Sequence, residues 1–279
     1  MLISVVTPSY RSSDWLRLCV RSVADQAAPG TEVEHIVQDG GSDDGTLDWL
    51  LKDTRVAAVA EPDQGMYDAI NRGLRRAHGV ILAYLNCDEQ YLPGTLPAVS
   101  AFFAGHPEID LVFGDVVAVG PDGNYLCYRK VESPRLYHTW VCHLSTLSCG
   151  MFFRRRVIDR GGCFFDPRYR SGGDGEWMVR LMRRGVPMGA LRQFTSAFTS
   201  TGANLGRSPV AREEWRTLRN TAPGWVRAFS PLWVFHHRVR RLLGGAYSQT
   251  PFSYAIYTHA SPDRRIVHTV KRPTSRWRS

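Results

Sequence analysis

Short apolar runs alternate with helix-forming segments through the first third of the chain, and this alternation constrains the fold more than any other feature. Four runs rich in aliphatic residues are predicted as strands: Leu2–Val6, Glu34–Gln38, Val56–Ala60 and Val80–Leu85. Apolar residues at helical spacing lie between them. Strands that alternate with helices form βαβ units and a mostly parallel central sheet with helices on both faces. We therefore predict an α/β, Rossmann-like fold.

Charge is distributed unevenly along the chain, whose formal net charge is +9. Residues 1–204 carry 21 Lys/Arg and 23 Asp/Glu, whereas residues 205–279 carry 14 Lys/Arg and 3 Asp/Glu. The body is therefore nearly neutral, and the positive excess lies in a C-terminal extension. A neutral body with no recognised DNA- or RNA-reading motif argues against a nucleic-acid-binding protein.

Membrane spans, export and zinc are not expected. The longest apolar runs, Val80–Leu85 and Pro231–Phe235, are far shorter than the ~20 residues that a spanning helix needs. The N-terminal segment has no basic region and no small-residue cleavage site, so we expect no signal peptide and a cytoplasmic protein. The six cysteines form no C-x-x-C pair, which favours reduced thiols and argues against a zinc site.

Four loops follow the predicted strands, at the edge where parallel sheets bind their ligands. They are Thr7–Arg11, Asp39–Thr46, Glu61–Tyr67 and Asn86–Tyr91. Three of the four carry acidic residues, and none contains a G-x-G-x-x-G or P-loop pattern. Acidic loops at this edge favour a metal-bridged phosphate ligand over a dinucleotide.

Asp88 and Glu89 come directly after the most apolar strand. Two adjacent carboxylates repel each other unless a cation bridges them. Mg2+ and Mn2+ bind one or two protein carboxylates together with substrate phosphates. The same pair is compatible with a solvated turn that caps a helix.

Three further acidic positions have both a binding and a structural interpretation. Asp39 can accept a hydrogen bond from a nucleobase or ribose, or belong only to a turn before a helix. Asp68 and Arg72 are four residues apart on a predicted helix, which is the spacing of a surface ion pair. Asp174, in the glycine-rich segment Ser171–Trp177, is either a general base or a helix N-cap.

Five motifs taken together resemble one known family. They are Thr7–Tyr10, Asp39–Thr46, Glu61–Gly73, Asn86–Glu89 and Asp174–Trp177. In order and spacing they closely resemble the family 2 glycosyltransferases, which are inverting enzymes with the GT-A fold, over about residues 2–204. The resemblance is strongest to bacterial members that build surface or capsular polysaccharides.

The resemblance implies a role for each matching residue. Pro8 and Tyr10 lie against the nucleoside, and Asp39 contacts the base. Asp63 and the segment from Gly65 through Asp68 to Asn71 border the donor. Asp88 and Glu89 match the motif that holds a divalent metal, Mn2+ or Mg2+, on the diphosphate, and Asp174 matches the catalytic base.

The resemblance also implies the reaction. A sugar passes from a nucleotide-diphosphate donor, with UDP favoured, to a hydroxyl of a glycan or lipid-linked acceptor. Asp174 removes the proton of that hydroxyl, and one displacement inverts the anomeric carbon. Two departures are that the usual Asn-Ser-Asp-Asp appears here as Asn-Cys-Asp-Glu and that Gly173 precedes Asp174. Glu is one methylene longer than Asp, so we expect a different metal geometry or preference, with an oxygen ligand retained. The Gln-x-x-Arg-Trp pattern of processive synthases is absent, which implies transfer of one sugar per encounter.

The C-terminal extension combines aromatic residues with arginines between Trp225 and Leu243. This pattern fits an interfacial segment on anionic lipid at the cytoplasmic face of the inner membrane. It equally fits helices that pack their aromatics on the catalytic domain. We expect a helical extension whose tail, His268–Ser279, is flexible.

The predicted organisation has three parts. Residues 1–115 are the nucleotide-sugar-binding half, 116–204 the acceptor-binding half with the base, and 205–279 the basic extension. Further predicted elements are a hairpin of Leu111–Val119 with Tyr125–Lys130, a strand over Ser148–Phe153 and a helix over Glu176–Arg184. The alternative function is a non-catalytic nucleotide-sugar or glycan-binding module, which the altered metal motif allows.

Overall fold

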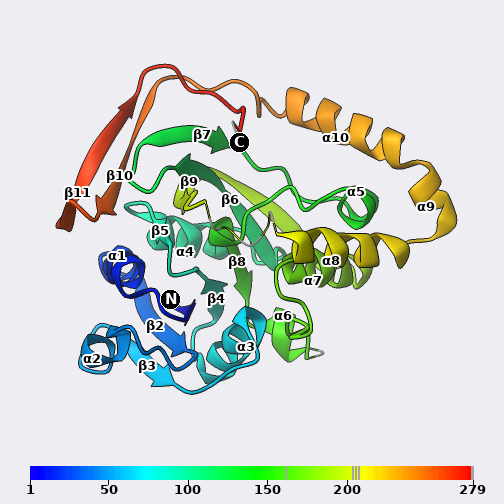
Figure 1. Cartoon of the computed structure of the whole chain (residues 1–279). Coiled ribbons are helices and arrows are strands. Elements are labelled where there is room, and N and C mark those ends of the chain that lie inside the picture. The colour runs from blue at the N-terminus through cyan, green and yellow to red at the C-terminus, as the bar shows by residue number, and fades with distance from the viewer. Residues whose placement is uncertain (161, 203, 205, 207, 278–279) are drawn as a thin grey trace.

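A nine-stranded mixed sheet forms the centre of the computed structural model, which describes residues 1–160, 162–202, 204, 206 and 208–277 (Figure 1). The strand order is β3-β2-β1-β4-β8-β6-β9-β5, and β7 pairs with β6. The strands of this sheet are β1 (Leu2–Ser9), β2 (Glu32–Asp39), β3 (Ala57–Ala60), β4 (Ile81–Tyr84), β5 (Glu89–Tyr91), β6 (Leu111–Val119), β7 (Tyr125–Arg129), β8 (Met151–Arg154) and β9 (Met188–Thr199).

The first four strands are parallel and are joined by helices, as the alternation of the sequence predicts. The α/β fold class is therefore confirmed. The helices are α1 (Ser13–Ala24), α2 (Thr46–Leu50), α3 (Met66–Arg76), α4 (Thr95–Gly105), α5 (Leu136–Val141), α6 (Arg156–Asp159), α7 (Gly173–Arg183), α8 (Pro209–Asn220), α9 (Gly224–Ala228) and α10 (Ser230–Leu243), with a 3-10 turn at Ser148–Gly150.

Helices cover both faces of the sheet. Strand β4 shows why its run is uniformly apolar: successive side chains point to opposite faces, and both faces are buried. Leu82 and Tyr84 pack in a core with α3, α6 and α7. Ile81 and Ala83 pack in a second core with α1 and α4.

Strand β1 continues through Pro8, where the sequence predicted that it would stop. Pro8 pairs in register with Gln38 of β2, but β4 ends at Tyr84 opposite Val6. Pro8 therefore lies where β1 has a neighbour on one side only, and this is where a strand tolerates proline. The extra length carries the residues after Val6 to the ligand-binding edge.

The second half of the sheet is mixed. The predicted hairpin is present as β6 and β7, and the predicted helix begins slightly earlier, as α7. Strand β9 runs parallel to β6, while β8 and β5 pair antiparallel to their neighbours. Helix α4 and strands β5 and β9 were not predicted from the sequence. The predicted boundary between residues 115 and 116 falls inside β6, so both halves share one sheet.

The C-terminal extension is helical through α10 and then forms a hairpin that was not predicted, β10 (Phe252–Thr258) with β11 (Ser261–Val270). Tyr254, Ile256 and Val270 pack against Leu92 and Val117 of the catalytic body. The expectation of a flexible tail is therefore wrong from His268 to Val270, because alternate residues of the hairpin are buried. The described C-terminal end, up to Trp277, runs back along β7 (Figure 1).

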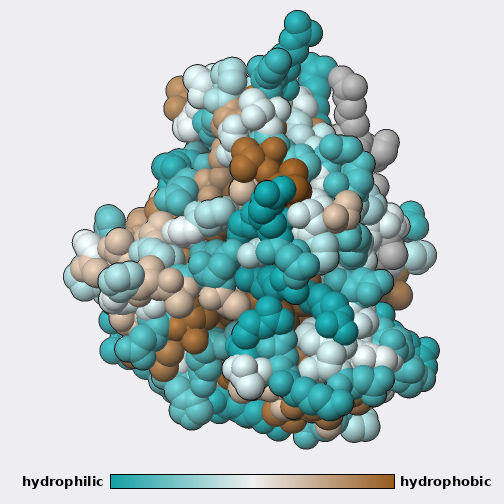
Figure 2. All heavy atoms as spheres, turned by 90° about the vertical axis from the view of Figure 1, so that its left-hand side faces the viewer, coloured by the Kyte–Doolittle hydropathy of each residue, from teal (hydrophilic) through white to brown (hydrophobic). Residues whose placement is uncertain are grey.

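Arg265 anchors this hairpin to the body. Its guanidinium donates to the carboxylate of Asp25 and to the carbonyls of Ser22, Tyr91 and Ala255. On the face that bears α1 and the hairpin, hydrophobic residues form small groups among hydrophilic ones (Figure 2). Among the described residues, no helix has the length and apolarity to cross a bilayer.

Candidate active site

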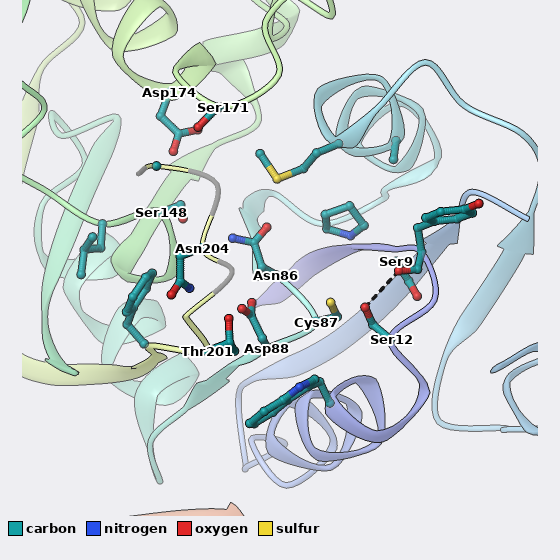
Figure 3. Close-up of a pocket in the computed structure, with 18 of the residues that line it drawn as sticks. Ser9, Ser12, Asn86, Cys87, Asp88, Ser148, Ser171, Asp174, Thr201 and Asn204 are labelled. Atoms are coloured by element: carbon teal, nitrogen blue, oxygen red, sulfur yellow. Dashed lines mark hydrogen bonds between the residues drawn. The ribbon is translucent and has the colours of Figure 1, made fainter. Parts of the chain in front are cut away.

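A cavity of about 910 Å³ opens beyond the carboxyl ends of the parallel strands (Figure 3). Pockets of about 300–1,000 Å³ are typical of small-molecule and cofactor sites. Its walls come from the ends of β1 and β4, the start of α3, the segments before α7 and after β9, and the C-terminal end. The predicted site residues that line it are Pro8, Tyr10, Asp63, Gly65, Asp88 and Asp174. Asp39, Asp68, Asn71 and Glu89 are not among its lining residues.

Tyr10 and Asp63 form one corner of the cavity. The ring of Tyr10 is 55% exposed, and Gly40 lies behind both side chains. A Cβ on Gly40 would lie 2.8 Å from Asp63 Oδ2 and 3.4 Å from Tyr10 Cδ2, so a larger residue would push them apart. Burial raises the pKa of Asp63, while the Gly65 N–H donates to its Oδ1 at 2.7 Å. An open ring beside a fixed carboxylate suits a flat base with N–H donors.

Asp39 is fully buried, and its carboxylate is occupied by its own loop. Oδ1 accepts from the N–H groups of Gly41 and Ser42, and Oδ2 accepts from the Ser42 hydroxyl. This is the turn interpretation of Asp39. Contact with a base stays a prediction that needs these bonds to rearrange.

Gly65 opens α3 with a φ of +119°, a conformation that favours glycine. A Cβ there would also lie 2.4 Å from Arg170 Nη1. Asp68 accepts from Gln64 N–H at 3.0 Å and pairs with Arg72 at 2.8 Å, which is the ion pair that its spacing allows.

Asn71 faces away from the cavity. Its amide donates to the Phe165 carbonyl at 2.8 Å, and its Oδ1 accepts from the Phe165 N–H at 3.0 Å. Asn71 thereby fastens the segment before α7 to α3.

Asp88 and Glu89 differ in environment. Asp88 is half-buried and lines the cavity, whereas Glu89 is buried in β5. Burial, followed by repulsion from Asp88, raises the pKa of Glu89 to about 8. The Cys149 thiol lies against the Glu89 carboxyl. Among the described residues, Asn86 Oδ1 is buried without a hydrogen-bond partner. An unpaired oxygen beside a lining carboxylate fits a divalent cation, with Asp88 as the ligand that reaches the cavity.

Asp174 lies in the first turn of α7, and its carboxylate points into the cavity (Figure 3). Burial raises its pKa to about 6. The Tyr84 hydroxyl donates to Asp174 Oδ1, which lowers the pKa but does not cancel the effect of burial. The Tyr67 hydroxyl accepts from the Asp174 N–H at 3.2 Å and donates to the Ser171 carbonyl at 3.0 Å. A carboxylate with a pKa near 6 is mostly ionised at neutral pH yet basic enough to take a proton.

Glu214 of α8 fixes the segment that carries Asp174. Its carboxylate accepts from the N–H groups of Arg170, Ser171 and Gly172 at 2.5, 3.0 and 2.6 Å. The C-terminal extension therefore orders the loop immediately before the base. A carboxylate that accepts several backbone N–H groups is a strong local restraint.

Several lining or supporting residues were not predicted from the sequence: Tyr84, Ser148, Thr201, Asn204, Glu214 and Trp277. Tyr67 lies in the predicted donor segment, but its contact with Asp174 was not predicted. Tyr84 could have been identified from the sequence, because a tyrosine in an otherwise aliphatic buried strand usually has a hydrogen-bond partner for its hydroxyl. Trp277 comes from the tail expected to be flexible, and its ring packs edge-on against Phe198, 5.5 Å between centroids. No local pattern links it to the site.

Comparisons with known proteins show what the chain is similar to. Residues 4–162 match the sequence profile described as "Glycosyl transferase family 2". The chain is 31% identical over 186 residues to a PGL/p-HBAD biosynthesis glycosyltransferase of Mycobacterium bovis, covering 64% of this chain and 69% of the relative. It is 27% identical over 198 residues to the glycosyltransferase AglE of Haloferax volcanii, covering 67% of this chain and 63% of the relative.

The fold is also similar to a solved structure, that of residues 1–349 of S. aureus TarS in complex with UDP-GlcNAc. The TM-score is 0.61 at 19% identity, and the alignment covers 78% of this chain. It spans 64% of the TarS chain, which is less than two thirds of its length. The GT-A fold expected from the sequence is thereby confirmed.

Proposed function

Because the chain belongs to glycosyl transferase family 2, we propose that this glycosyltransferase moves one sugar from a nucleotide-diphosphate donor to a hydroxyl of a glycan or lipid-linked acceptor, with inversion. A UDP-sugar is the favoured donor. The observation that carries the proposal is the placement of Asp174, a carboxylate with a pKa near 6, in a cavity whose other walls present Asp88 and the Tyr10–Asp63 corner.

The chain's own residues perform the proton transfer in this scheme. Ionised Asp174 accepts the proton of the acceptor hydroxyl as that oxygen attacks the anomeric carbon. The bond from the anomeric carbon to the diphosphate oxygen breaks in the same step, and its electron pair leaves with the nucleotide diphosphate. Attack opposite the leaving group inverts the carbon. Tyr84 holds the carboxylate in place, and the Tyr67 hydroxyl holds the backbone of Asp174.

A divalent metal, Mn2+ or Mg2+, fits the unpaired Asn86 Oδ1 beside Asp88. When bound, it would neutralise charge on the diphosphate. Asp88 is the ligand that we propose, and Glu89 supports it from beneath by holding the Asn86 N–H at 2.9 Å. Direct coordination by Glu89 requires its side chain to turn toward the cavity.

A role in cell-surface glycan or glycolipid synthesis is supported by the relatives. The Mycobacterium protein is named for PGL/p-HBAD biosynthesis, and the TarS structure contains UDP-GlcNAc. We propose a donor and an acceptor of these general classes for this chain.

A donor panel tests the proposal. UDP-, GDP- and dTDP-sugars would be assayed for release of nucleotide diphosphate, with and without Mn2+, and for binding by thermal shift. We expect Mn2+-dependent release from one donor, lost in Asp88→Asn and kept in Asp122→Asn, an exposed turn residue. Binding without release, even with an acceptor extract, would favour a non-catalytic nucleotide-sugar-binding module. No binding of any donor would refute the proposal.

We further propose that α9 and α10 contact an anionic membrane at the cytoplasmic face. Large apolar side chains there are exposed: Trp225, Phe229, Leu232, Phe235 (65%), Leu242 and Leu243 (82%). Exposed Arg227 and Arg238 lie among them. Apolar groups beside arginines fit the interface of anionic lipid, and such a site would suit a lipid-linked acceptor.

Vesicle sedimentation tests the membrane contact. Wild type should pellet with phosphatidylglycerol-containing vesicles and not with pure phosphatidylcholine. Phe235→Ser with Leu243→Ser should abolish this, whereas Val267→Ser, an exposed apolar residue on β11, should not. Equal pelleting of all variants would show that α9 and α10 are not the contact.

A further inference from the structure

Three histidines from separate segments of the chain come together in the fold. His138 lies on α5, His143 in the segment after α5, and His237 on α10. One ring nitrogen from each lies within 4.8 Å of the others. The ring centroids of His138 and His237 are 4.0 Å apart, and those of His138 and His143 are 4.7 Å apart. The sequence offered no hint of this cluster, because His237 is 94 residues beyond His143.

Two of these rings have an unsatisfied polar atom in the protein interior. His138 is 3% exposed and His237 is 7% exposed. Among the described residues, the Nε2 atoms of both are buried without a hydrogen-bond partner. Buried polar atoms are nearly always paired, so two orphans in one cluster point to a missing ligand. His143 is exposed, so the cluster is open to solvent on that side.

The charges around the cluster bear on which ligand it takes. Burial first, and then the neighbouring histidines and arginines, lower the pKa of His138 to about 3 and of His237 to about 4. Neutral imidazoles keep the lone pair that a metal requires. The arginines that face the cluster are Arg129, Arg240 and Arg241, and His236 also lies near it.

The arginines also contact other groups. Arg240 donates to the Ser133 carbonyl at 3.2 Å, and the rings of Trp277 and Tyr247 lie under Arg129 and Arg241. Their remaining positive field opposes a bare cation but would stabilise an anionic fourth ligand, such as hydroxide or chloride, on the open side.

We propose that His138, His143 and His237 bind one Zn2+ ion, with the fourth position left to solvent or an anion. Imidazole nitrogens are common zinc ligands, with Zn–N distances of about 2.0–2.1 Å and tetrahedral geometry, which place the nitrogens about 3.3–3.4 Å apart. The rings of His138 and His237 are stacked, with 17° between their planes. Binding therefore requires at least one of them to turn so that its nitrogen points at the shared ion. The cysteines of the sequence argued against zinc, but this site uses none of them.

The site would fasten the extension to the catalytic body. Zinc would tie α10 to α5 and to the segment that reaches the cavity at Thr146, three residues after His143. Binding is therefore expected to raise the thermal midpoint of the whole chain, because only the folded state brings the three ligands together.

Zinc titration of the full chain tests the proposal. The protein is stripped with EDTA, and Zn2+ binding is measured by calorimetry and by metal analysis after desalting. The Asp88→Asn background keeps the proposed donor-site metal from contributing. We expect one Zn2+ per chain and a higher thermal midpoint. In His237→Gln and His143→Gln the affinity for Zn2+ should fall by more than about 100-fold. Loss of a residue that only hydrogen-bonds to a metal ligand costs about 10–100-fold, and loss of the ligand itself should cost more.

His236→Gln is the matched control, because His236 is the exposed neighbour of His237 on the same helix. It should bind Zn2+ like wild type. His143→Gln alters an exposed residue and should fold normally, so a misfolded His237 variant would not obscure the result. The proposal is overturned if wild type binds no stoichiometric Zn2+, if His143→Gln binds as tightly as wild type, or if His236→Gln weakens binding equally. A His143-dependent response to phosphate without Zn2+ binding would also overturn it and indicate an anion site.

Discussion

Tyr84→Phe isolates the hydrogen bond that sets the basicity of Asp174. The Tyr84 hydroxyl donates to Asp174 Oδ1, and this bond lowers a pKa that burial has raised to about 6. A hydrogen bond to a charged group contributes about 1.5–3 kcal/mol, and about 1.4 kcal/mol corresponds to one pH unit. Removing the hydroxyl should therefore raise the pKa of Asp174 to about 7–8.

The expected result is a shifted pH profile. At pH 7 the ionised fraction of Asp174 falls from about 90% to between about 50% and 10%, so donor turnover falls about 2- to 10-fold. At pH 9 the base is ionised in both proteins, and the rates should approach each other. The assay is nucleotide diphosphate release from the donor that the panel identifies, measured from pH 5 to 9 at fixed Mn2+.

Tyr91→Phe is the matched control. Tyr91 is fully buried, and among the described residues its hydroxyl has no partner, so its removal should leave the profile unchanged. If Tyr84→Phe keeps the wild-type acid limb, or loses the same fraction of activity at every pH, then the hydroxyl does not tune the base and the reasoning fails.

Three other changes probe the supports of the site. Arg265→Ala should lower the free energy of unfolding by about 2–4 kcal/mol, because it removes the hydrogen bonds from the guanidinium to Asp25 and to three carbonyls. Exposed Arg264→Ala should change it by less than about 0.5 kcal/mol. Equal denaturation midpoints would show that the hairpin anchor is not Arg265. Gly173→Ala should lower the free energy of unfolding by about 1–3 kcal/mol and also lower turnover, since its Cβ would lie 2.7 Å from the Tyr67 ring. Gly105→Ala is the control, because there is open space around Gly105. Unchanged turnover in Gly173→Ala would contradict the packing argument. Asp174→Asn should raise the thermal midpoint above that of wild type, and by more at pH 8 than at pH 5. Burial raises the pKa of Asp174 to about 6 in the folded state, whereas an unfolded Asp has a pKa near 4. The carboxyl therefore stabilises the wild-type fold below about pH 4, and this stabilisation is lost as the pH rises through 6. A constant difference across this range would mean that the carboxyl is not destabilised by burial.

The parallel half of the fold could be predicted because local patterns and global topology agree there. Strands β1 to β4 are short apolar runs with turn residues between them, and residues that end or follow β1, β3 and β4 line one cavity. The predicted base and the predicted metal ligand Asp88 both reach that cavity. Whether they act as proposed stays open to the experiments above.

The rest depended on contacts between distant segments. Asp39 ends β2 and Asn71 lies on α3, but neither lines the cavity. The bonds to Ser42 and Phe165 that occupy them arise only in the folded chain. Strand β9 is unrecognisable locally, because its first residues are half-exposed and not alternating. The hairpin β10–β11 has a strand pattern in its sequence, since Tyr254, Ile256 and Thr258 alternate with more exposed residues. It was not predicted because the basic residues around it favoured a helical extension.

The most direct test of the central claim separates binding from chemistry in Asp174→Asn. Donor affinity, measured by calorimetry in Mn2+, should match wild type, because the substitution keeps the shape of the side chain. Nucleotide diphosphate release should fall by about 10²–10⁴, the usual contribution of a general base. If Asp174→Asn releases the nucleotide at the wild-type rate, Asp174 is not the base and the account of this cavity is wrong.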